Sequence, residues 1–304
     1  MKNTTKKIIA LLLAVLMIGM FASCSTTTGK GAIEVTDSMG NIIKLDKPAE
    51  KIISLLPSDT ETLYALGAQD KIIAVAKICT YPAEVSQKTQ LDTAEKTNVE
   101  TIIAMDPDVV LMGKMSQTKD QADQMANAGI KVIITEPQSI DDIYAMTTLI
   151  GKIVNKTKAA DKLNATMKKG FSDLSNNAIS VAKKSVYIEI SPLEFTLWTT
   201  GADTFYNEIL ELLEMTNSFA DLTSWSSVSE EQVISRNPDV IVTTMGTTPT
   251  EGEASIAEIL GRTNWKNMSA IKNKKVFWID SNKFSIPGPR LVESAQELLD
   301  ILKK

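Results

Sequence analysis

The chain has 304 residues, enough for two domains, and its 37 acidic and 32 basic side chains give a formal net charge of −5 at pH 7. An acidic surface without basic runs argues against nucleic acid as a partner and against an electrostatic membrane patch. The sequence contains no histidine, which excludes Ser-His-Asp and Cys-His nucleophile systems and removes the commonest protein ligand of free transition metals. An enzyme built on carboxylates is still allowed.

Residues 1–23 have the pattern of a secretory signal peptide: lysines without acids, followed by the apolar run 8–21, which is too short for a comfortable membrane span. This run ends in Phe21-Ala22-Ser23-Cys24, which resembles the lipobox of bacterial lipoproteins, although leucine is commoner where Phe21 stands. The resemblance implies that Cys24 becomes the acylated first residue of the mature chain, anchored to the membrane. Residues 24–31 are then a flexible polar tether.

The chain has two cysteines, and lipidation of Cys24 would leave Cys79 as its one thiol. A disulfide framework and a zinc cluster of cysteines are therefore excluded. We expect Cys79 to be a small buried apolar residue.

The chain beyond the tether consists of strand-then-helix units, which is typical of an α/β fold. In the first half we expect strands at 33–36, 42–45, 51–56, 71–76, 108–112 and 130–135, and helices at 58–67 and 117–128. Ser58 and Glu61 have the spacing of a capping box. In the second half we expect strands at 185–190, after residue 238, and at 275–279, helices at 203–214 and 254–260, a last helix near Pro289, and loops at 191–200, 217–227 and 281–288.

The two halves share an internal repeat, because residues 98–111 match residues 229–242 without a gap. The aligned pairs are Glu100 with Glu231, Ile103 with Ile234, Pro107 with Pro238, Asp108 with Asp239, and Val109 with Val240. Each copy predicts a short amphipathic helix that stops before its proline and leads into a strand buried on both faces. Two α/β lobes explain the match economically, and convergence of two βα units is the alternative.

Residues 139–178 separate the repeats and have helical character. Ser139 and Asp142 predict a capped helix start, and apolar residues then follow at three-and-four spacing. A second helix is expected from Asn155 to the Asn176-Asn177 pair, about 20 residues and roughly 30 Å long. We therefore predict an N-terminal lobe at 32–138, connecting helices at 139–178 and a C-terminal lobe at 179–304; a crossover helix inside one domain is the alternative.

Four further motifs follow in order along nearly the whole mature chain: Cys79-Thr80-Tyr81-Pro82, Trp198-Thr199-Thr200-Gly201, Phe219-Ala220-Asp221, and Pro287-Gly288-Pro289-Arg290-Leu291-Val292-Glu293. With the two Glu units, their order and spacing resemble the substrate-binding proteins of bacterial ABC importers for ferric siderophores, haem and cobalamin. The resemblance implies an α/β fold of two Rossmann-like lobes joined by a single long backbone helix, with the ligand cleft between them.

The resemblance also implies ligand contacts for Trp198 and Trp225, since aromatic residues at these positions contact the corrinoid in cobalamin-binding members. The first-lobe aromatic positions hold Ile78 and Ala94 here, so the ligand stays open between a corrinoid and a ferric siderophore. Core packing is the alternative for both tryptophans, although their polar loop sequence favours an exposed platform.

Two more residues are candidate ligand contacts. Tyr81 lies either in the cleft or in ordinary packing. Arg290 binds an acidic ligand group, or it caps a helix or pairs with Glu293. Glu100 and Glu231 could be solvated charges, but their equivalence and the resemblance imply that they dock onto the two permease subunits.

The sequence thus predicts a monomeric, lipid-anchored binding protein, and not an enzyme, that captures a metal chelate outside the cytoplasmic membrane and delivers it to an ABC permease and its ATPase. We expect no resident cofactor or metal site, because the metal arrives already coordinated. A haem-binding protein of the same family, with a tyrosine as axial ligand, is one alternative. A carboxylate-based extracytoplasmic hydrolase is another.

Overall fold

The computed structural model describes residues 32–93, 98–114, 119–178 and 183–303. Cys24, the predicted lipidation site, and Ala94 lie outside these residues. Within the described ranges, no helix is both long and apolar enough to cross a membrane.

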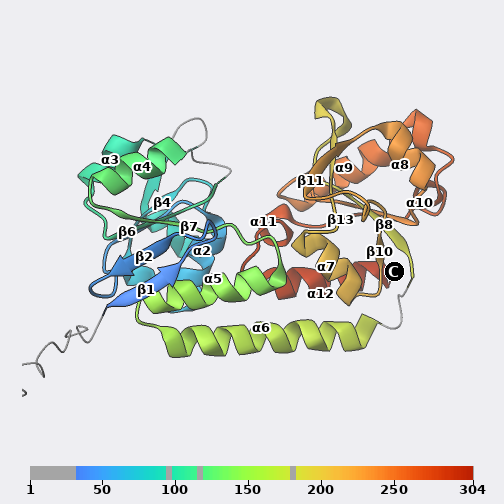
Figure 1. Cartoon of the computed structure of the whole chain (residues 1–304). Coiled ribbons are helices and arrows are strands. Elements are labelled where there is room, and N and C mark those ends of the chain that lie inside the picture. Colours follow the sequence, from blue (N-terminus) through green and yellow to red (C-terminus); the bar gives the residue numbers. More distant parts are fainter. Residues whose placement is uncertain (1–31, 94–97, 115–118, 179–182, 304) are drawn as a thin grey trace, which may run out of the picture.

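The N-terminal lobe is built on a five-stranded parallel sheet with the order β5-β4-β3-β6-β7 (Figure 1). The strands are β3 (Ile52–Ser54), β4 (Ile72–Ala76), β5 (Thr89–Leu91), β6 (Val109–Met112) and β7 (Lys131–Ile134). Every residue of β3 and β6 is buried, as expected for apolar strands covered on both faces. The lobe also contains the hairpin β1 (Ile33–Thr36) and β2 (Ile42–Leu45), and helices α2 (Pro57–Ala65), η1 (Gln69–Lys71), η2 (Ala83–Gln87), α3 (Val99–Ala104) and α4 (Lys119–Asn127).

The C-terminal lobe has a four-stranded parallel sheet with the order β10-β8-β12-β13, and a separate antiparallel pair of β9 and β11. The strands are β8 (Ser185–Glu189), β9 (Leu197–Thr200), β10 (Thr216–Asn217), β11 (Trp225–Val228), β12 (Val240–Thr243) and β13 (Val276–Trp278). The helices are η4 (Leu193–Phe195), α7 (Phe205–Leu212), α8 (Glu230–Arg236), α9 (Pro249–Gly261), η5 (Thr263–Trp265), α10 (Ser269–Lys272), α11 (Ser281–Phe284) and α12 (Leu291–Leu302). The predicted two-lobed α/β fold is confirmed.

Two antiparallel helices make the connection, α5 (Ile140–Ile153) and α6 (Thr157–Asn177). Ser139 and Asp142 form the predicted capping box at the start of α5. The expected start of the second helix at Asn155 is wrong: Asn155 has a φ of 57°, in the left-handed region, which ends one helix and turns the chain before the next.

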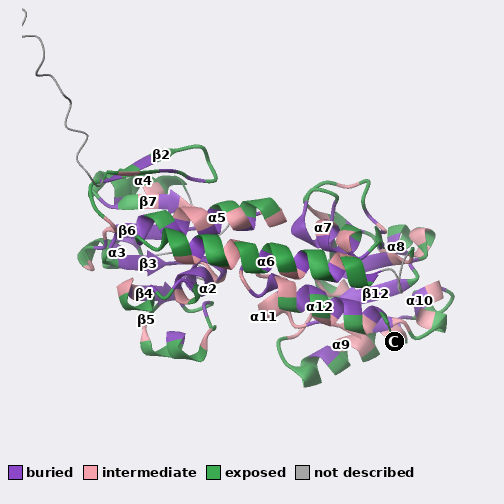
Figure 2. Ribbon diagram, turned by 90° about the horizontal axis from the view of Figure 1, so that it is seen from below, coloured by how far each residue is buried: buried purple, intermediate pink, exposed green. Residues whose placement is uncertain are grey.

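Helix α6 contacts both lobes, because it packs on α5 of the N-terminal side and on α7 and α12 of the C-terminal lobe. Figure 2 shows its buried stripe beside an exposed face. Gly170, a half-buried residue of α6, lies so close to Val292 that a Cβ would collide with the valine side chain. The bare backbone of Gly170 therefore permits the close approach of α6 and α12.

The repeated segments form the same local structure in both lobes. Asn98 and Ser229 cap α3 and α8, each accepting the backbone N–H three residues ahead. After each helix the chain passes through a left-handed residue, Asp106 with a φ of 49° and Asn237 with a φ of 45°. The predicted order of short helix, proline and buried strand is therefore confirmed in each copy.

Three local expectations are wrong. The loop predicted at 281–288 begins with the short helix α11, whose first turn Asp280 caps by accepting the N–H of Asn282. Helix α2 has no side-chain cap, begins with Pro57 at its first position, and uses Glu61 for a different contact. The predicted loops at 191–200 and 217–227 contain β9 and β11, whose pairing lies outside the main sheet. A pair of four-residue strands with no partner nearby in sequence gives too weak a pattern to be predicted.

Candidate functional site

A hollow of about 320 Å³ lies between the lobes, and we call it the front cleft. Its lining comprises Leu56, Pro57, Ser58, Gly113, Lys114, Thr135, Glu136, Pro137, Gln138, Phe205, Trp225, Ser285, Ile286 and Pro287. The N-terminal lobe contributes the segments that directly follow β3, β6 and β7. The front cleft is therefore at the carboxyl ends of parallel strands, where open α/β sheets bind their ligands.

The front cleft is mostly apolar and has few charged groups. Lys114 and Glu136 face it from the N-terminal lobe, and Gln138 adds an amide. Burial raises the pKa of Glu136, and the nearby Lys114 opposes this shift. Such a lining suits a ligand with a large apolar area and a few polar groups that fix its orientation.

The pair of β9 and β11 places the two predicted tryptophans on one face. In the antiparallel register, Trp198 lies opposite Ser227 and Trp225 lies opposite Thr200. Because side chains alternate along a strand, Trp198 and Thr200 point to the same side as Trp225 and Ser227. Trp198 is 39% exposed and Trp225 is half-buried, so neither is a core residue.

Aromatic neighbours hold Trp225 in place. Its ring lies edge-on to Tyr206, with centroids 5.4 Å apart, and to Phe205, with centroids 6.4 Å apart. Tyr206 in turn packs against Phe284 at 4.9 Å. These contacts leave Trp225 as a rigid aromatic surface, which loses little freedom when a ligand binds.

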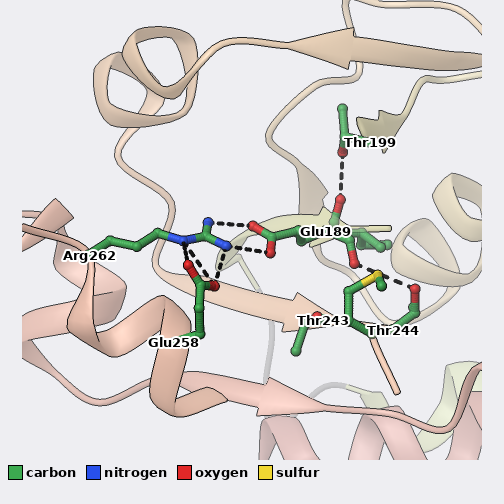
Figure 3. Close-up of polar contacts among 8 residues, drawn as sticks. Glu189, Thr199, Thr243, Thr244, Glu258 and Arg262 are labelled. Carbon is green, nitrogen blue, oxygen red and sulfur yellow. Dashed lines mark hydrogen bonds and ion pairs between the residues drawn. The ribbon is translucent and has the colours of Figure 1, made fainter. Parts of the chain in front are cut away.

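A buried ion pair of Arg262 and Glu189 lies at the end of β8 (Figure 3). Arg262 donates to both carboxylate oxygens of Glu189, at 2.8 and 2.9 Å, and also to Glu258. The guanidinium lies 4.2 Å from the ring centroid of Trp265. A bidentate pair compensates the buried charges, and it fixes the end of α9 to the last residue of β8.

A second hollow of about 1000 Å³, the rear groove, lies on another side of the boundary between the lobes. Its lining comprises Glu61, Tyr64, Ala65, Gln69, Tyr81, Pro82, Glu84, Gln87, Lys88, Leu163, Thr166, Met167, Gly170, Pro289, Arg290, Val292 and Glu293. These residues belong to the N-terminal lobe, to α6 and to the start of α12. The rear groove thus touches both lobes and their connection.

The segment 286–290 separates the two hollows. Ile286 and Pro287 line the front cleft, and Arg290 lines the rear groove. Between them, a Cβ on Gly288 would lie 3.6 Å from the Cα of Ser58. The segment is therefore in close contact with the first turn of α2.

The predicted ligand residues divide between the two hollows. Trp225 lines the front cleft and Trp198 shares its strand face, whereas Tyr81 and Arg290 lie together at the rear groove. Arg290 pairs with Glu61, which lies 229 residues away in sequence, and not with Glu293. No local pattern in the chain indicates it.

The remaining predicted residues that the structure describes line neither hollow. Glu100 on α3 and Glu231 on α8 are exposed, and Figure 1 shows these helices on opposite lobes, on the side of the molecule away from α6. Cys79 is buried, as predicted, and burial raises the pKa of its thiol to about 12.

The front-cleft residues at 56–58, 113–114 and 135–138 are not among the predicted ligand residues. Each group follows a strand that the sequence does predict, so the rule that ligands bind beyond the carboxyl ends of parallel strands could have found them. Residues 285–287 lie in the segment predicted as a loop after the strand at 275–279, and Pro287 begins one of the four motifs.

One buried acid lies next to the front cleft. Asp59 is fully buried in the first turn of α2 and accepts a hydrogen bond from the hydroxyl of Thr135, which lines the cleft. Its other oxygen, Oδ1, has no hydrogen-bond partner among the described residues. Burial raises the pKa of Asp59 to about 7, and the bond from Thr135 opposes this shift.

The model of a family described as periplasmic binding protein matches residues 52–283. An uncharacterised ABC transporter substrate-binding lipoprotein of Bacillus subtilis is 35% identical over 274 residues, which cover 88% of this chain and 84% of the relative. A cobalamin-binding protein of Halobacterium salinarum is 28% identical over 265 residues, covering 84% of this chain and 70% of the relative.

Among solved structures, a possible iron-binding, periplasmic solute-binding protein of Staphylococcus epidermidis is similar with a TM-score of 0.74 and 33% identity. The match covers 85% of this chain and 100% of that one. The similarity therefore extends over both lobes and the connecting helices.

Proposed function

The chain belongs to the periplasmic binding protein family, as a substrate-binding protein of an ABC transporter, and we propose that it captures a metal chelate in the front cleft and delivers it to an importing permease. The chelate is a corrinoid or a ferric siderophore. The names of the relatives support both classes, since one is a cobalamin-binding protein and another a possible iron-binding protein.

The observation that carries this proposal is the aromatic strand face beside the cleft. Trp198 and Trp225 share that face, and Phe205 and Tyr206 hold Trp225 rigidly. Large ligands with extended apolar faces gain affinity from such surfaces because little side-chain freedom is lost. One side of the chelate would occupy the front cleft, and the rest would extend over the exposed Trp198.

The alternatives have less support. A tyrosine that ligates haem iron would have to face the ligand, but Tyr81 lies at the rear groove, 3.8 Å from the guanidinium of Arg290. Among the described residues that line the front cleft, Glu136 is the one carboxylate. Glycoside hydrolysis by carboxylates uses a pair. The position of Tyr81 and the single carboxylate in the lining therefore favour chelate binding over haem ligation and over hydrolysis.

The location and partners complete the proposal. Diacylglycerol on Cys24 anchors the protein outside the cytoplasmic membrane, where it works as a monomer. Glu100 and Glu231 contact basic residues of the two permease subunits, and the associated ATPase drives uptake. The exposure of both acids, one on each lobe and on one side of the molecule, supports this role.

The test is a titration of the protein with cyanocobalamin, a ferric hydroxamate, a ferric catecholate and haem, followed by tryptophan fluorescence. We expect a corrinoid or a ferric siderophore to quench the emission and to bind more tightly than haem. Trp225→Ala should weaken this binding, while Trp278→Phe, which changes an indole outside both hollows, should not. If none of the four compounds binds the wild type, the proposal is wrong.

A further inference from the structure

Glu61 and Arg290 form a buried ion pair between the lobes. Arg290 Nε lies 2.9 Å from Glu61 Oε2, and Nη2 donates to Oε1 of the same carboxylate. Glu61 is 4% exposed and Arg290 is 8% exposed. Two parallel N–H···O bonds in a site shielded from water fix both the separation and the relative orientation of the groups.

Further contacts hold the guanidinium from both lobes. The ring of Tyr81, in the N-terminal lobe, covers it with a centroid distance of 3.8 Å. The carbonyl oxygen of Asn282, in the C-terminal lobe, accepts a 2.6 Å bond from Nη2. Arg290 is also the residue that directly precedes α12, which packs on α6. The pair therefore links α2 to α12 through short, directional contacts.

This link lies three residues beyond the walls of the front cleft in each lobe. Leu56, Pro57 and Ser58 form part of one wall, and Glu61 follows three residues later on α2. Ser285, Ile286 and Pro287 belong to the opposite wall, and Arg290 follows three residues after Pro287. The two segments that face each other across the cleft are thus tied together three residues beyond each wall, on α2 and directly before α12.

We propose that Glu61 and Arg290, covered by Tyr81, are an interlobe latch that sets the spacing of the two cleft walls. Tyr81 and Arg290 are then positioning residues and not contacts of the ligand. The latch holds the lobes in the binding arrangement before the ligand arrives, so the ligand does not have to order them. The effect on chelate affinity rests on the proposed function, whereas the effect on lobe spacing does not.

The variants must separate lobe spacing from stability. Removing one partner of a buried pair leaves an uncompensated charge and can unfold the protein. Replacing both partners by apolar residues of similar volume is often neutral for stability. The test variant is therefore Glu61→Leu with Arg290→Met. The matched control is Glu189→Leu with Arg262→Met, which removes a buried, bidentate Arg–Glu pair that lies within one lobe.

Lobe spacing is measured by double electron–electron resonance between spin labels on Gln124→Cys in α4 and Glu253→Cys in α9. Both positions are exposed, one on each lobe. The full chain carries Cys24→Ser, so that the buried Cys79 is the one other thiol. We expect a narrow distance distribution without latch mutations, and a broader distribution with a longer mean in the latch variant. The control pair should keep the narrow distribution. If the control does not fold, Lys283→Met with Glu297→Leu, another ion pair within the C-terminal lobe, replaces it.

The second arm measures affinity for whichever of cyanocobalamin or the ferric siderophores binds the wild type. The latch variant should lose affinity by roughly tenfold, equivalent to about 1.4 kcal/mol, and the control should not. If the latch variant has the wild-type distance distribution, or if the control broadens equally, the latch is wrong, whatever binds in the cleft. If no chelate binds the wild type but the distribution still broadens, the latch stands and the proposed function fails.

Discussion

Asp108 and Asp239 have the same role in the two lobes. Asp108 Oδ2 accepts the backbone N–H of Lys51 at 2.9 Å, just before β3, and Asp239 Oδ2 accepts the N–H of Ser185 at 2.9 Å, at the start of β8. In each lobe the aspartate also directly precedes the strand that pairs with β3 or β8, since β6 starts at Val109 and β12 at Val240. The internal repeat thus fixes the register of the central strands in both sheets.

Loss of either aspartate should reduce stability by a similar amount. Asp108→Ala and Asp239→Ala each remove a carboxylate that accepts two hydrogen bonds at the end of a central strand, at a cost of about 1 kcal/mol per bond in the free energy of unfolding. The two sites lie in different lobes, so the double variant should show the sum of both effects. Urea unfolding checks this, with the exposed Asp70→Ala as control. A change at only one of the two sites would contradict the equivalence.

The tryptophan face should account for much of the binding energy. Trp198→Ala and Trp225→Ala are each expected to cost roughly 1–3 kcal/mol of binding free energy, as for aromatic hot spots in protein interfaces. The larger loss is expected for Trp225, which lines the front cleft and is held by Phe205 and Tyr206. Calorimetric titration with the chelate that binds the wild type measures both. If both variants fold and bind the chelate with wild-type affinity, the two tryptophans do not contact the ligand.

The repeated unit and the connecting helices could be predicted because their signals are local. The caps at Asn98, Ser229 and Ser139 act within one turn, and the apolar spacing of α6 is visible in the sequence. A local pattern gave a wrong prediction at Ser58, because its spacing to Glu61 fits a capping box that the structure does not form. Glu61 instead binds Arg290 of the other lobe, because a buried charge pair is stronger than an optional cap.

The site itself was only half predictable. The tryptophans could be named, but their common face depends on the register of β9 and β11, which brings Trp198 opposite Ser227. Arg290 was named as a candidate without its partner, since contacts between distant segments leave no spacing pattern. Tyr81 was open between cleft and packing, and the structure places its ring on Arg290 at the rear groove.

Asp59 should make stability depend on pH. Its folded pKa of about 7 lies above the ordinary value of 3.8, because burial disfavours the charged form. Between these two values the folded state keeps a proton that the unfolded state has lost. The contribution of Asp59 to the free energy of unfolding is therefore fully present below pH 3.8. It falls by about 1.4 kcal/mol per pH unit as the pH rises from 3.8 to about 7.

The check is the difference in unfolding free energy between wild type and Asp59→Asn, measured from pH 4 to pH 8. Asparagine cannot ionise, and its carbonyl can still accept the hydrogen bond from Thr135. The variant should gain stability relative to the wild type as the pH rises, and the gain should level off above about pH 7. A difference that does not change with pH would show that Asp59 is not protonated in the folded protein.

Lipidation of Cys24 should decide where the protein is found in the cell. Stable anchoring requires more than one acyl chain, which diacylglycerol on this cysteine supplies. In cell fractions the wild type should stay with the membranes, and Cys24→Ser should be released or remain unprocessed. Wild-type protein that is wholly soluble and begins at Ser25 or later would contradict the anchor.

Glu100 and Glu231 should affect delivery of the chelate without affecting its capture. Both side chains are exposed and line neither hollow, so Glu100→Ala with Glu231→Ala should leave chelate affinity and thermal stability nearly unchanged.

Uptake into cells and association with the permease should fall in this double variant, because such rim charges act on encounter and register, with roughly 0.2–1 kcal/mol for each exposed pair. Wild-type association should weaken at raised ionic strength, where exposed charges are screened, and the double variant should lose most of that dependence. Asp70→Ala with Glu253→Ala removes one exposed acid from each lobe at other places and is the matched control. Normal transport by the double variant, or loss of chelate binding in its place, would show that these acids are not the docking charges.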